Sequence, residues 1–424
     1  CQGRTEWYAN TVGPLPQEII GVALAADGSI VVAGTVSDTF TFQSETATST
    51  NSTDDVFVAK LDPTTGAIQW FTRFAGNCSE KVGTLTISPA GDIIVTGRVF
   101  FPLSGCSVNG VAIVSEGATL PRHFVVRMGD DGNIINTKQL DMHYVYSVAA
   151  TATELFIAGR RYSPAMPSNI SYYANKYDLN GVPSGTTTWL SGYELKALYA
   201  EGNNIWAAGL YSGTVGLPDS FDFTSSGGTD IFVARITSNF SFTVAASFGG
   251  TGDDAPTAIY ADAGGVYLGG SFASPTIDLG ADTLTNSDAS KDAFVAKLTN
   301  TLSPMGALQI GGTNEQSISS ISRSGPGLSV AGQFRGVLTL AGLPGDVISN
   351  GNTDTFVTPD TLQPVWRRVV GGADYDYAWA AGGPDGETYY AARIFGPVDI
   401  DDTQAGVENS TETSDEGYVM RMAP

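Results

Sequence analysis

The segment Asp292-Ala-Phe-Val-Ala-Lys297 decides the fold, because variants of it recur along the whole chain. In each copy an acidic or polar residue precedes an apolar strand with an aromatic centre, and a base closes most copies. The central aromatic residues are 67, 49, 59, 62, 62 and 62 residues apart, and they are Phe57, Phe124, Tyr173, Phe232, Phe294, Phe356 and Tyr418. This period over 424 residues indicates one repeat architecture rather than several unrelated domains.

Two further phrases keep the same period. An apolar phrase such as Gly28-Ser-Ile-Val-Val-Ala-Gly34 occurs seven times, and all copies but the last close with glycine. Phrases such as Trp366 to Gly372 also end in glycine, often in a glycine pair. Each phrase is short, rich in Val, Ile, Phe and Tyr, and bounded by Gly, Asp or Asn, which is typical of β-strands. Each unit therefore provides about four strands, and such a unit is typical of a β-propeller blade.

We predict an all-β, seven-bladed β-propeller with four-stranded blades over residues 6–424, and a lipid anchor or linker at residues 1–5. The long connections between second and third strands, such as residues 271–291, predict an extra hairpin insertion on one side of each blade. The first strand of each blade is rich in small residues and is expected to line the central channel. These segments are residues 19–24, 84–87, 145–150, 195–200, 256–261, 317–322 and 377–381.

The two ends of the chain predict how the ring closes. The last unit reaches Pro424 before its fourth strand, whereas Trp7 to Gly13 precedes the first unit and matches the outer-strand phrase at Trp366. We expect this N-terminal strand to complete the seventh blade as its outermost strand. Such pairing covers strand edges that would otherwise recruit other chains.

These phrases resemble the bacterial seven-bladed propeller repeat family known as SBBP. The shared elements are Asp-x-Phe-Val-Ala-Lys-Leu, x-x-x-Trp-x-x-x-Phe-Gly-Gly and Asp-Gly-x-Ile-Val-Val-x-Gly, and they extend over nearly the whole chain. The third unit departs most, because it is short and Tyr173-Ala-Asn-Lys176 replaces Phe-Val-Ala-Lys. The resemblance implies a propeller in an exported bacterial protein. It implies no common reaction and no catalytic residues, since a fold does not dictate a function.

The composition argues against several classes of function. The chain has 43 acidic and 21 basic residues, a net charge of −22, so it repels phosphate backbones and no nucleic-acid partner is expected. Two histidines and three cysteines leave little material for a transition-metal site or a Cys/His nucleophile. The motifs of zinc proteases, serine hydrolases and phosphate-binding loops do not occur. We predict that the protein is not an enzyme, and that His123 and His143 are surface or packing residues.

The cysteines predict the cellular location of the protein. A chain that begins with Cys1 resembles a mature bacterial lipoprotein, in which this residue carries the lipid, and Gln2 resembles the signal for sorting to the outer membrane. The alternative is that Cys1 results from processing. In an exported protein the remaining pair, Cys78 and Cys106, predicts a disulfide, with two separate buried thiols as the alternative.

Paired acidic residues in the connections are candidates for a calcium site, and they are Asp253, Asp254, Asp374 and Asp376. Calcium takes six to eight oxygen ligands from carboxylates and carbonyl groups. The alternative is that these side chains cap turns. No other cofactor is expected.

Three functions agree with these observations. The first is a non-enzymatic, outer-membrane-anchored propeller that acts as a protein-binding scaffold or accessory subunit of a cell-surface complex, with other envelope proteins as partners. Loops carry binding, so the aromatic and acidic loops on the hairpin side are the expected contact surface. The second is a carbohydrate-binding or glycan-processing propeller, and glycan hydrolysis would need two facing carboxylates. The third is a surface adhesin. The sequence does not identify the partner or ligand.

Overall fold

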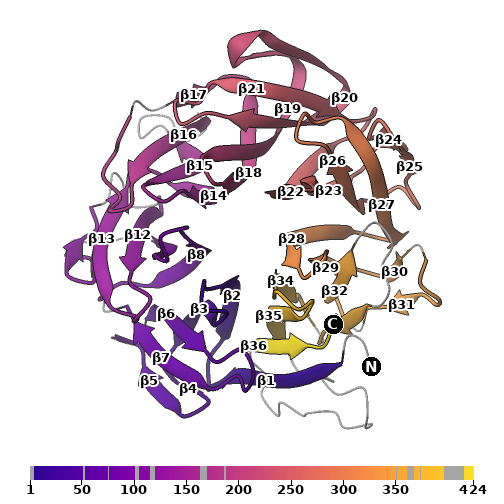
Figure 1. Ribbon diagram of the computed structural model, residues 1–424. Helices are drawn as coiled ribbons and strands as arrows, with labels where there is room; N and C mark the ends of the chain where they lie inside the picture. The colour runs from indigo at the N-terminus through magenta and orange to yellow at the C-terminus, as the bar shows by residue number, and fades with distance from the viewer. Residues whose placement is uncertain are drawn as a thin grey trace.

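Seven sheets surround a central channel in the computed structural model, and each sheet forms one blade of a β-propeller (Figure 1). The structure describes residues 4–50, 53–74, 76–100, 105–114, 120–162, 170–185, 188–340, 342–349, 351–360, 367–372, 374–395 and 415–424. The blades follow one another around the ring in chain order, so each packs on the blades before and after it. The predicted all-β, seven-bladed fold is confirmed.

Blades 1 to 4 each have four strands, and their order runs from the channel outward. Blade 1 contains β2 (Gln17–Leu24), β3 (Ile30–Ser37), β6 (Asp54–Leu61) and β7 (Ile68–Arg73). Blade 2 contains β8 (Glu80–Ile87), β9 (Ile93–Val99), β12 (Arg122–Met128) and β13 (Ile134–Leu140). Blade 3 contains β14 (Tyr144–Ala150), β15 (Glu154–Tyr162), β16 (Ile170–Asp178) and β17 (Thr188–Leu190). Blade 4 contains β18 (Tyr193–Glu201), β19 (Asn204–Leu217), β20 (Phe221–Ile236) and β21 (Phe242–Phe248).

Blades 5 to 7 have the same order of strands. Blade 5 contains β22 (Asp254–Asp262), β23 (Gly265–Phe272), β26 (Asp292–Leu298) and β27 (Pro304–Thr313). Blade 6 contains β28 (Gln316–Ser324), β29 (Gly327–Phe334), β32 (Asp354–Asp360) and β33 (Arg368–Val370). Blade 7 contains β34 (Tyr377–Gly382), β35 (Thr388–Phe395), β36 (Asp415–Met422) and the N-terminal strand β1 (Thr5–Val12).

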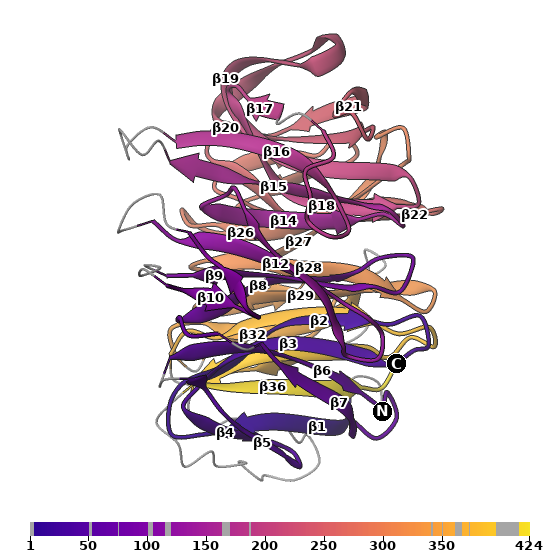
Figure 2. The same cartoon turned by 90° about the vertical axis from the view of Figure 1, so that its left-hand side faces the viewer.

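The N-terminal strand closes the ring as predicted. Strand β1 runs antiparallel to β36, with Trp7 opposite Arg421 and Asn10 opposite Tyr418. The backbone N–H of Gly417 donates to the side-chain oxygen of Thr11 at 2.8 Å in the same contact. Because both ends of the chain form one blade, unfolding of either end opens the ring. Both termini lie on the same face of the disc, at the right in Figure 2.

Small hairpins occupy the connections between second and third strands, as predicted. They are β4 (Thr39–Phe42) with β5 (Glu45–Thr48), β10 (Ser107–Val108) with β11 (Val111–Ala112), β24 (Thr276–Asp278) with β25 (Thr283–Thr285), and β30 (Val337–Leu340) with β31 (Val347–Ile348). In blade 4 the strands β19 and β20 continue into the hairpin and turn at a 3-10 segment, Pro218–Ser220. The connections of blades 3 and 7, residues 163–169 and 396–414, lie outside the described residues.

Each of these paired hairpins contacts the blade before its own. Strand β4 of blade 1 pairs with β1, the outer strand of blade 7, and β30 of blade 6 pairs with β27 of blade 5. Single bridges make the equivalent contact at Gly76 with Val108 and at Gly249 with Asp278. The hairpins therefore fasten neighbouring blades together, which local sequence patterns did not predict. We call the end of the disc from which these connections leave the hairpin face.

The first strands line the channel, as predicted. A cavity of about 570 Å³ on the axis is bordered by β2, β8, β14, β18, β22, β28 and β34. Six of the seven strands have a small residue at one register position, where crowding favours it, and blade 7 has Trp379 there. The small residues are Gly21, Thr84, Ser147, Ala197, Ala258 and Ser320. In six of these strands a β-bulge comes just before the small residue. Bulges re-aim side chains, and the bulged residues Tyr146 and Lys196 line the channel.

The repeated glycine and the repeated aromatic residue are cross-strand partners. Gly34 of β3 lies opposite Phe57 of β6, and Gly332 of β29 lies opposite Phe356 of β32. A Cβ atom on Gly34 would lie 2.4 Å from the Phe57 ring, so only glycine leaves room for it. The ring covers backbone that glycine would otherwise leave without packing. This contact explains why the two sequence phrases recur with the same period.

Candidate functional site

A buried acidic residue lies two positions before the central aromatic residue of the third strand in five blades, and these residues are Asp55, Asp230, Asp292, Asp354 and Glu416. In blade 5, Oδ2 of Asp292 accepts hydrogen bonds from the backbone and the hydroxyl of Ser287 at 2.8 and 2.7 Å. It also accepts one from Gln309 of the outer strand at 2.6 Å. The carboxylate thus joins the end of the hairpin connection to the outer strand. These repeated acids are structural, as buried hydrogen-bonded polar groups usually are.

A second buried polar residue lies at or just before the start of the inner strand in six blades, and these residues are Gln17, Glu80, His143, Asp254, Gln316 and Asp376. The N–H of Gly250 donates to Asp254 at 2.8 Å, and that of Gly372 donates to Asp376 at 2.6 Å. Asp254 also accepts a hydrogen bond from the hydroxyl of Ser274 at 2.7 Å. The glycine pair in the sequence therefore supplies the backbone donor that satisfies the acid of the next blade.

The four calcium candidates are Asp253, Asp254, Asp374 and Asp376, and the structure leaves them in two places, before blade 5 and before blade 7. Asp253 accepts a hydrogen bond from the N–H of Thr229 at 2.9 Å, and Asp374 accepts one from the Asn352 amide at 3.0 Å. Among the described residues, no group of three or more His, Cys, Asp or Glu is placed to hold a metal ion. These contacts favour turn capping, and calcium binding stays a prediction.

The interface between blades 1 and 2 holds two carboxyl groups that face one another. Asp55 and Glu80 are both fully buried, and Asp55 also forms an ion pair with Arg73. Burial, followed by the charge of Asp55 and a hydrogen bond to it, raises the pKa of Glu80 from 4.5 to about 9. Glu80 therefore keeps its proton at neutral pH and donates it to Asp55. Blades 1 and 6 have Gln17 and Gln316 at the same position, and an amide needs no such proton.

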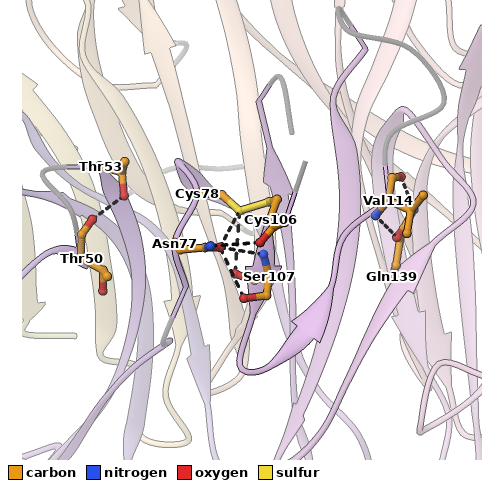
Figure 3. The surroundings of a disulfide bond; sticks show 9 residues. Thr50, Thr53, Asn77, Cys78, Cys106, Ser107, Val114 and Gln139 are labelled. Atoms are coloured by element: carbon orange, nitrogen blue, oxygen red, sulfur yellow. Dashed lines mark hydrogen bonds between the residues drawn. A yellow bond between two sulfur atoms is a disulfide. The ribbon is translucent and has the colours of Figure 1, made fainter. Parts of the chain in front are cut away.

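A disulfide joins Cys78 to Cys106, the two cysteines paired in the sequence-based prediction (Figure 3). Their Cα atoms are 5.7 Å apart, within the usual range for this bond. The bond ties the loop before β8 to the connection that carries β10 and β11. The Asn77 side chain supports the same loop, accepting from the N–H of Ser107 at 2.8 Å and donating to the carbonyl of Gly105 at 3.0 Å.

The two histidines are part of the packing between blades. His123 and His143 are buried packing residues between blades 2 and 3, and Nδ1 of His143 accepts a hydrogen bond from the N–H of Tyr162 at 2.9 Å. Burial, followed by the positive charge of Arg98, lowers the pKa of His123 to about 3, so this imidazole is neutral. Cys1, the predicted lipidation site, lies outside the described residues.

A groove of about 630 Å³ lies between blades 3 and 4 at the hairpin face. Its lining combines aromatic, hydroxyl and carboxylate groups, and includes Tyr172, Tyr193, Glu194, Tyr211, Ser212 and Thr229. Tyr172 is half-buried and Ser212 is exposed, so both are accessible from the open side. Such a mixture of apolar walls with a few polar groups is typical of a binding site.

At the groove the connection between the two blades is short. Only Ser191 and Gly192 separate β17, a strand of three residues, from β18, whereas residues 249–253 separate β21 from β22. Residues 314–315 alone separate β27 from β28, so a short connection by itself does not open a groove. Blade 3 also has Ser171 where five other blades have the buried acidic residue. The groove therefore lies where a short outer strand and a short connection coincide with the loss of this carboxylate.

Beside the groove, cations and aromatic rings gather at the mouth of the channel. We define this mouth cluster as Tyr144, Tyr146, Arg160, Tyr162, Glu194 and Lys196. The guanidinium of Arg160 lies 4.3 Å from the ring centre of Tyr144 and 5.2 Å from that of Tyr162. The ammonium of Lys196 lies 4.3 Å from the ring of Tyr146 and 2.5 Å from a Glu194 oxygen. Cation–π contacts of this kind hold the charged groups in place.

The groove and the channel together contain one carboxylate, whereas glycan hydrolysis would need two. Among the described residues that line the groove, Glu194 is the one acid, and the described lining of the channel has none. Glu194 is moreover bound to Lys196. The geometry of these two cavities therefore suits binding better than acid–base chemistry.

Comparison with known proteins bears on the fold alone. No family model matches the chain, and no curated protein matches it. The β-propeller domain of Cps50 (Swd1) from Myceliophteria thermophila is similar at 10% identity with a TM-score of 0.50, over 98% of this chain and 99% of that one. The WD40 domain of Neurospora crassa Pan2 has 11% identity and a TM-score of 0.47, over 98% and 96%. The resemblance to the SBBP family stays a prediction.

Sequence patterns did not identify the groove or the mouth cluster. The available signal was the short third unit, because the spacings of 49 and 59 residues on either side of Tyr173 fall below the usual 62. That signal marks a departure from the repeat, but it does not show which side chains meet there.

Proposed function

We propose that this protein is a non-enzymatic binding propeller, a scaffold or accessory subunit of a cell-surface complex, whose partner docks on the hairpin face at blades 3 and 4. The observation that carries the proposal is the groove lined by Tyr172, Glu194 and Ser212, where blade 3 departs from the repeat. Residues that recur at the same position of many blades are required by the fold. Residues at which one blade departs from the repeat are available for binding a partner.

The chemistry of this surface supports a protein partner. Tyrosine and arginine are enriched among the residues that carry most of the binding energy in protein interfaces. The groove and the mouth cluster together present tyrosines beside Arg160 and Lys196 on a rigid ring of strands. A rigid surface loses little entropy when a partner binds.

We further propose that the protein is exported and held at the bacterial outer membrane through Cys1. The disulfide between Cys78 and Cys106 supports an oxidising compartment. No helix in the described part of the chain is long and apolar enough to cross a membrane. The N–H of Ala423 donates to the carbonyl of Arg4. This contact lies on the face of the disc opposite the hairpin face (Figure 2). An anchor attached there therefore directs the groove away from the bilayer. Intact-mass spectrometry of native protein tests the anchor, and a free thiol at Cys1 contradicts it.

Capture of partners from solubilised membranes tests the function. Ser212→Arg places a bulky side chain at the groove without disturbing the core, because Ser212 is exposed and Arg335 occupies the equivalent position of blade 6. Ala273→Arg, at the equivalent position of blade 5, is the matched control.

The expected result is one stoichiometric partner that is captured by wild type and by Ala273→Arg and is lost with Ser212→Arg. Equal capture by all three proteins contradicts the assignment of the groove. Absence of any stoichiometric partner contradicts the scaffold function.

A further inference from the structure

We propose that Arg98 and Arg160 form a carboxylate-binding site at the hairpin-face mouth of the channel, and that the occupant is an acidic segment of a partner protein. This inference rests on the proposed function, because it names the chemistry that the partner must present. It concerns residues beside the groove rather than the groove itself, so the two proposals have separate tests.

The two arginines occupy the same position in neighbouring blades. Arg98 of β9 lies opposite Lys81, and Arg160 of β15 lies opposite Tyr144. Lys81 is the second residue of β8 and Tyr144 is the first residue of β14, so both arginines lie at the channel mouth. Because the blades are related by the repeat, the register places both guanidinium groups at the same depth on the hairpin face.

Neither arginine is neutralised by the part of the chain that the structure describes. No carboxylate among the described residues lies within 4 Å of the guanidinium of Arg98 or Arg160, and the Nε–H of each has no hydrogen-bond acceptor there. In a chain with 43 acidic and 21 basic residues, an arginine has many potential partners. The Nε atoms of both arginines are buried, whereas their terminal nitrogens are not, so the terminal N–H groups are available to an external anion.

The lysines around them are paired with acids. Among the described residues, Lys81 is paired with Glu18 and Asp54, and Lys196 is paired with Glu194. Arg98 and Arg160 therefore carry the positive charge that the described acids of this mouth leave unpaired, in a protein of net charge −22. Since exposed charges are screened beyond about 8 Å at physiological salt, a local surplus can attract an anion that the whole molecule repels.

Aromatic contacts fix the orientation of the arginines. Arg160 lies over the rings of Tyr144 and Tyr162, and Arg98 lies 4.6 Å from the ring centre of Phe100. A guanidinium held flat against a ring keeps its N–H edge free, and that edge matches the two oxygens of a carboxylate. The buried ring of His123 lies 6.4 Å from that of Tyr144, and because it is neutral it adds no charge beside the arginines.

The neighbouring groove favours a protein over an acidic glycan. Its walls include Ile170, Leu190 and Tyr172, which suit an apolar side chain next to an acidic one. Ile170 is 39% exposed, so it has apolar surface left to cover. A polysaccharide offers carboxylates but no apolar side chain for this wall.

Fluorescence anisotropy with the labelled peptide (Glu)8 tests the site in the intact, disulfide-bonded protein, and (Lys)8 serves as the control peptide. The variants are Arg98→Gln, Arg160→Gln and the double substitution. The matched control is Arg235→Gln, because Arg235 also lies over an aromatic ring, 5.7 Å from Trp206, but at the opposite end of the blade. We expect wild type and Arg235→Gln to bind (Glu)8 equally, each single variant to bind less tightly, and the double variant to lose about tenfold or more. Unchanged melting temperatures show that all variants are folded.

Three results of the peptide experiment would overturn the inference. They are no binding of (Glu)8 by wild type, equal binding by the double variant, and tighter binding of oligogalacturonate than of (Glu)8, which would assign the site to an acidic glycan. Partner capture that is lost with Ser212→Arg but unchanged in the double arginine variant contradicts this inference and leaves the proposed function standing. Failure to capture any partner, with (Glu)8 binding intact, contradicts the proposed function instead.

Discussion

Asp55 and Glu80 form a hydrogen-bonded carboxyl pair that is completely buried between blades 1 and 2. Each comes from a different blade, and Arg73 neutralises Asp55 alone. One proton must therefore stay between the two acids for the interface to remain closed. The pair makes the stability of this interface depend on pH, whereas Gln17 and Gln316 remove that dependence in blades 1 and 6.

The first prediction is that Glu80→Gln stabilises the protein at pH 8. The unfolded chain releases the Glu80 proton near pH 4.5 and the folded chain near pH 9, so its contribution is complete below pH 4.5 and is lost as the pH rises through 9. We expect the variant to gain about 1–3 kcal/mol at pH 8 and a flatter pH profile of the free energy of unfolding, measured by urea titration. The reciprocal change Gln316→Glu, facing Asp292, should lose stability as the pH rises. A profile unchanged by both substitutions would contradict the proton-sharing pair.

The second prediction concerns the disulfide. Cys78 and Cys106 are 28 residues apart. In the chain-entropy model, removing a disulfide that closes a loop of this length lowers the free energy of unfolding by about 3–4 kcal/mol. We expect the double variant Cys78→Ser/Cys106→Ser to unfold at a lower urea concentration than the oxidised wild type. Reduction of wild type with dithiothreitol should reproduce the effect and leave the double variant unchanged. Peptide mapping that recovers the two cysteines unlinked would contradict the bond.

The third prediction concerns closure of the ring. The indole N–H of Trp7 donates to the carbonyl of Pro63 at 3.1 Å, and its ring covers Gly66 of the next blade. Trp7→Ala therefore loosens blade 7 from blade 1 and should cost about 2–4 kcal/mol by thermal or urea unfolding. Tyr8→Ala is the control, because Tyr8 is 37% exposed on the same strand. Equal losses from both substitutions would mean that the Trp7 contact is not specific.

The fourth prediction concerns calcium. Asp253 and Asp374 each accept a hydrogen bond from a protein donor, and Asp254 and Asp376 are capped by glycine N–H groups. We expect excess EDTA to leave the melting temperature unchanged, because these oxygens already have partners. A drop of several degrees that added calcium restores would establish a metal site. In that event Asp254→Asn should abolish the effect of calcium.

Much of the fold was predictable from the residues themselves. The period of the Phe57 and Gly34 phrases predicted seven blades because each strand, and its pairing within a blade, depends on neighbouring segments of the chain. The match between Trp7 and Trp366 predicted the closing strand, since both segments need the same position in a blade. The pairing of Cys78 with Cys106 followed from the cysteine count.

The candidate site was less predictable. Its arginines, Arg98 and Arg160, lie in repeat strands that look ordinary in sequence, and Lys196 reaches Tyr146 from the next blade. The hairpins likewise pair with the preceding blade rather than within their own. Such contacts join residues about 30 to 50 positions apart, and they depend on the angle and separation of two sheets.

The sequence by itself determined the number of blades, the strands and the way the ring closes, because hydrophobic alternation and strand pairing within a unit are local properties. The tertiary structure alone decided where the ring opens into a groove and which cations meet there. The packing between blades sets those distances, and it depends on local departures from the repeat, such as the short strand β17 and the two residues 191–192 that follow it.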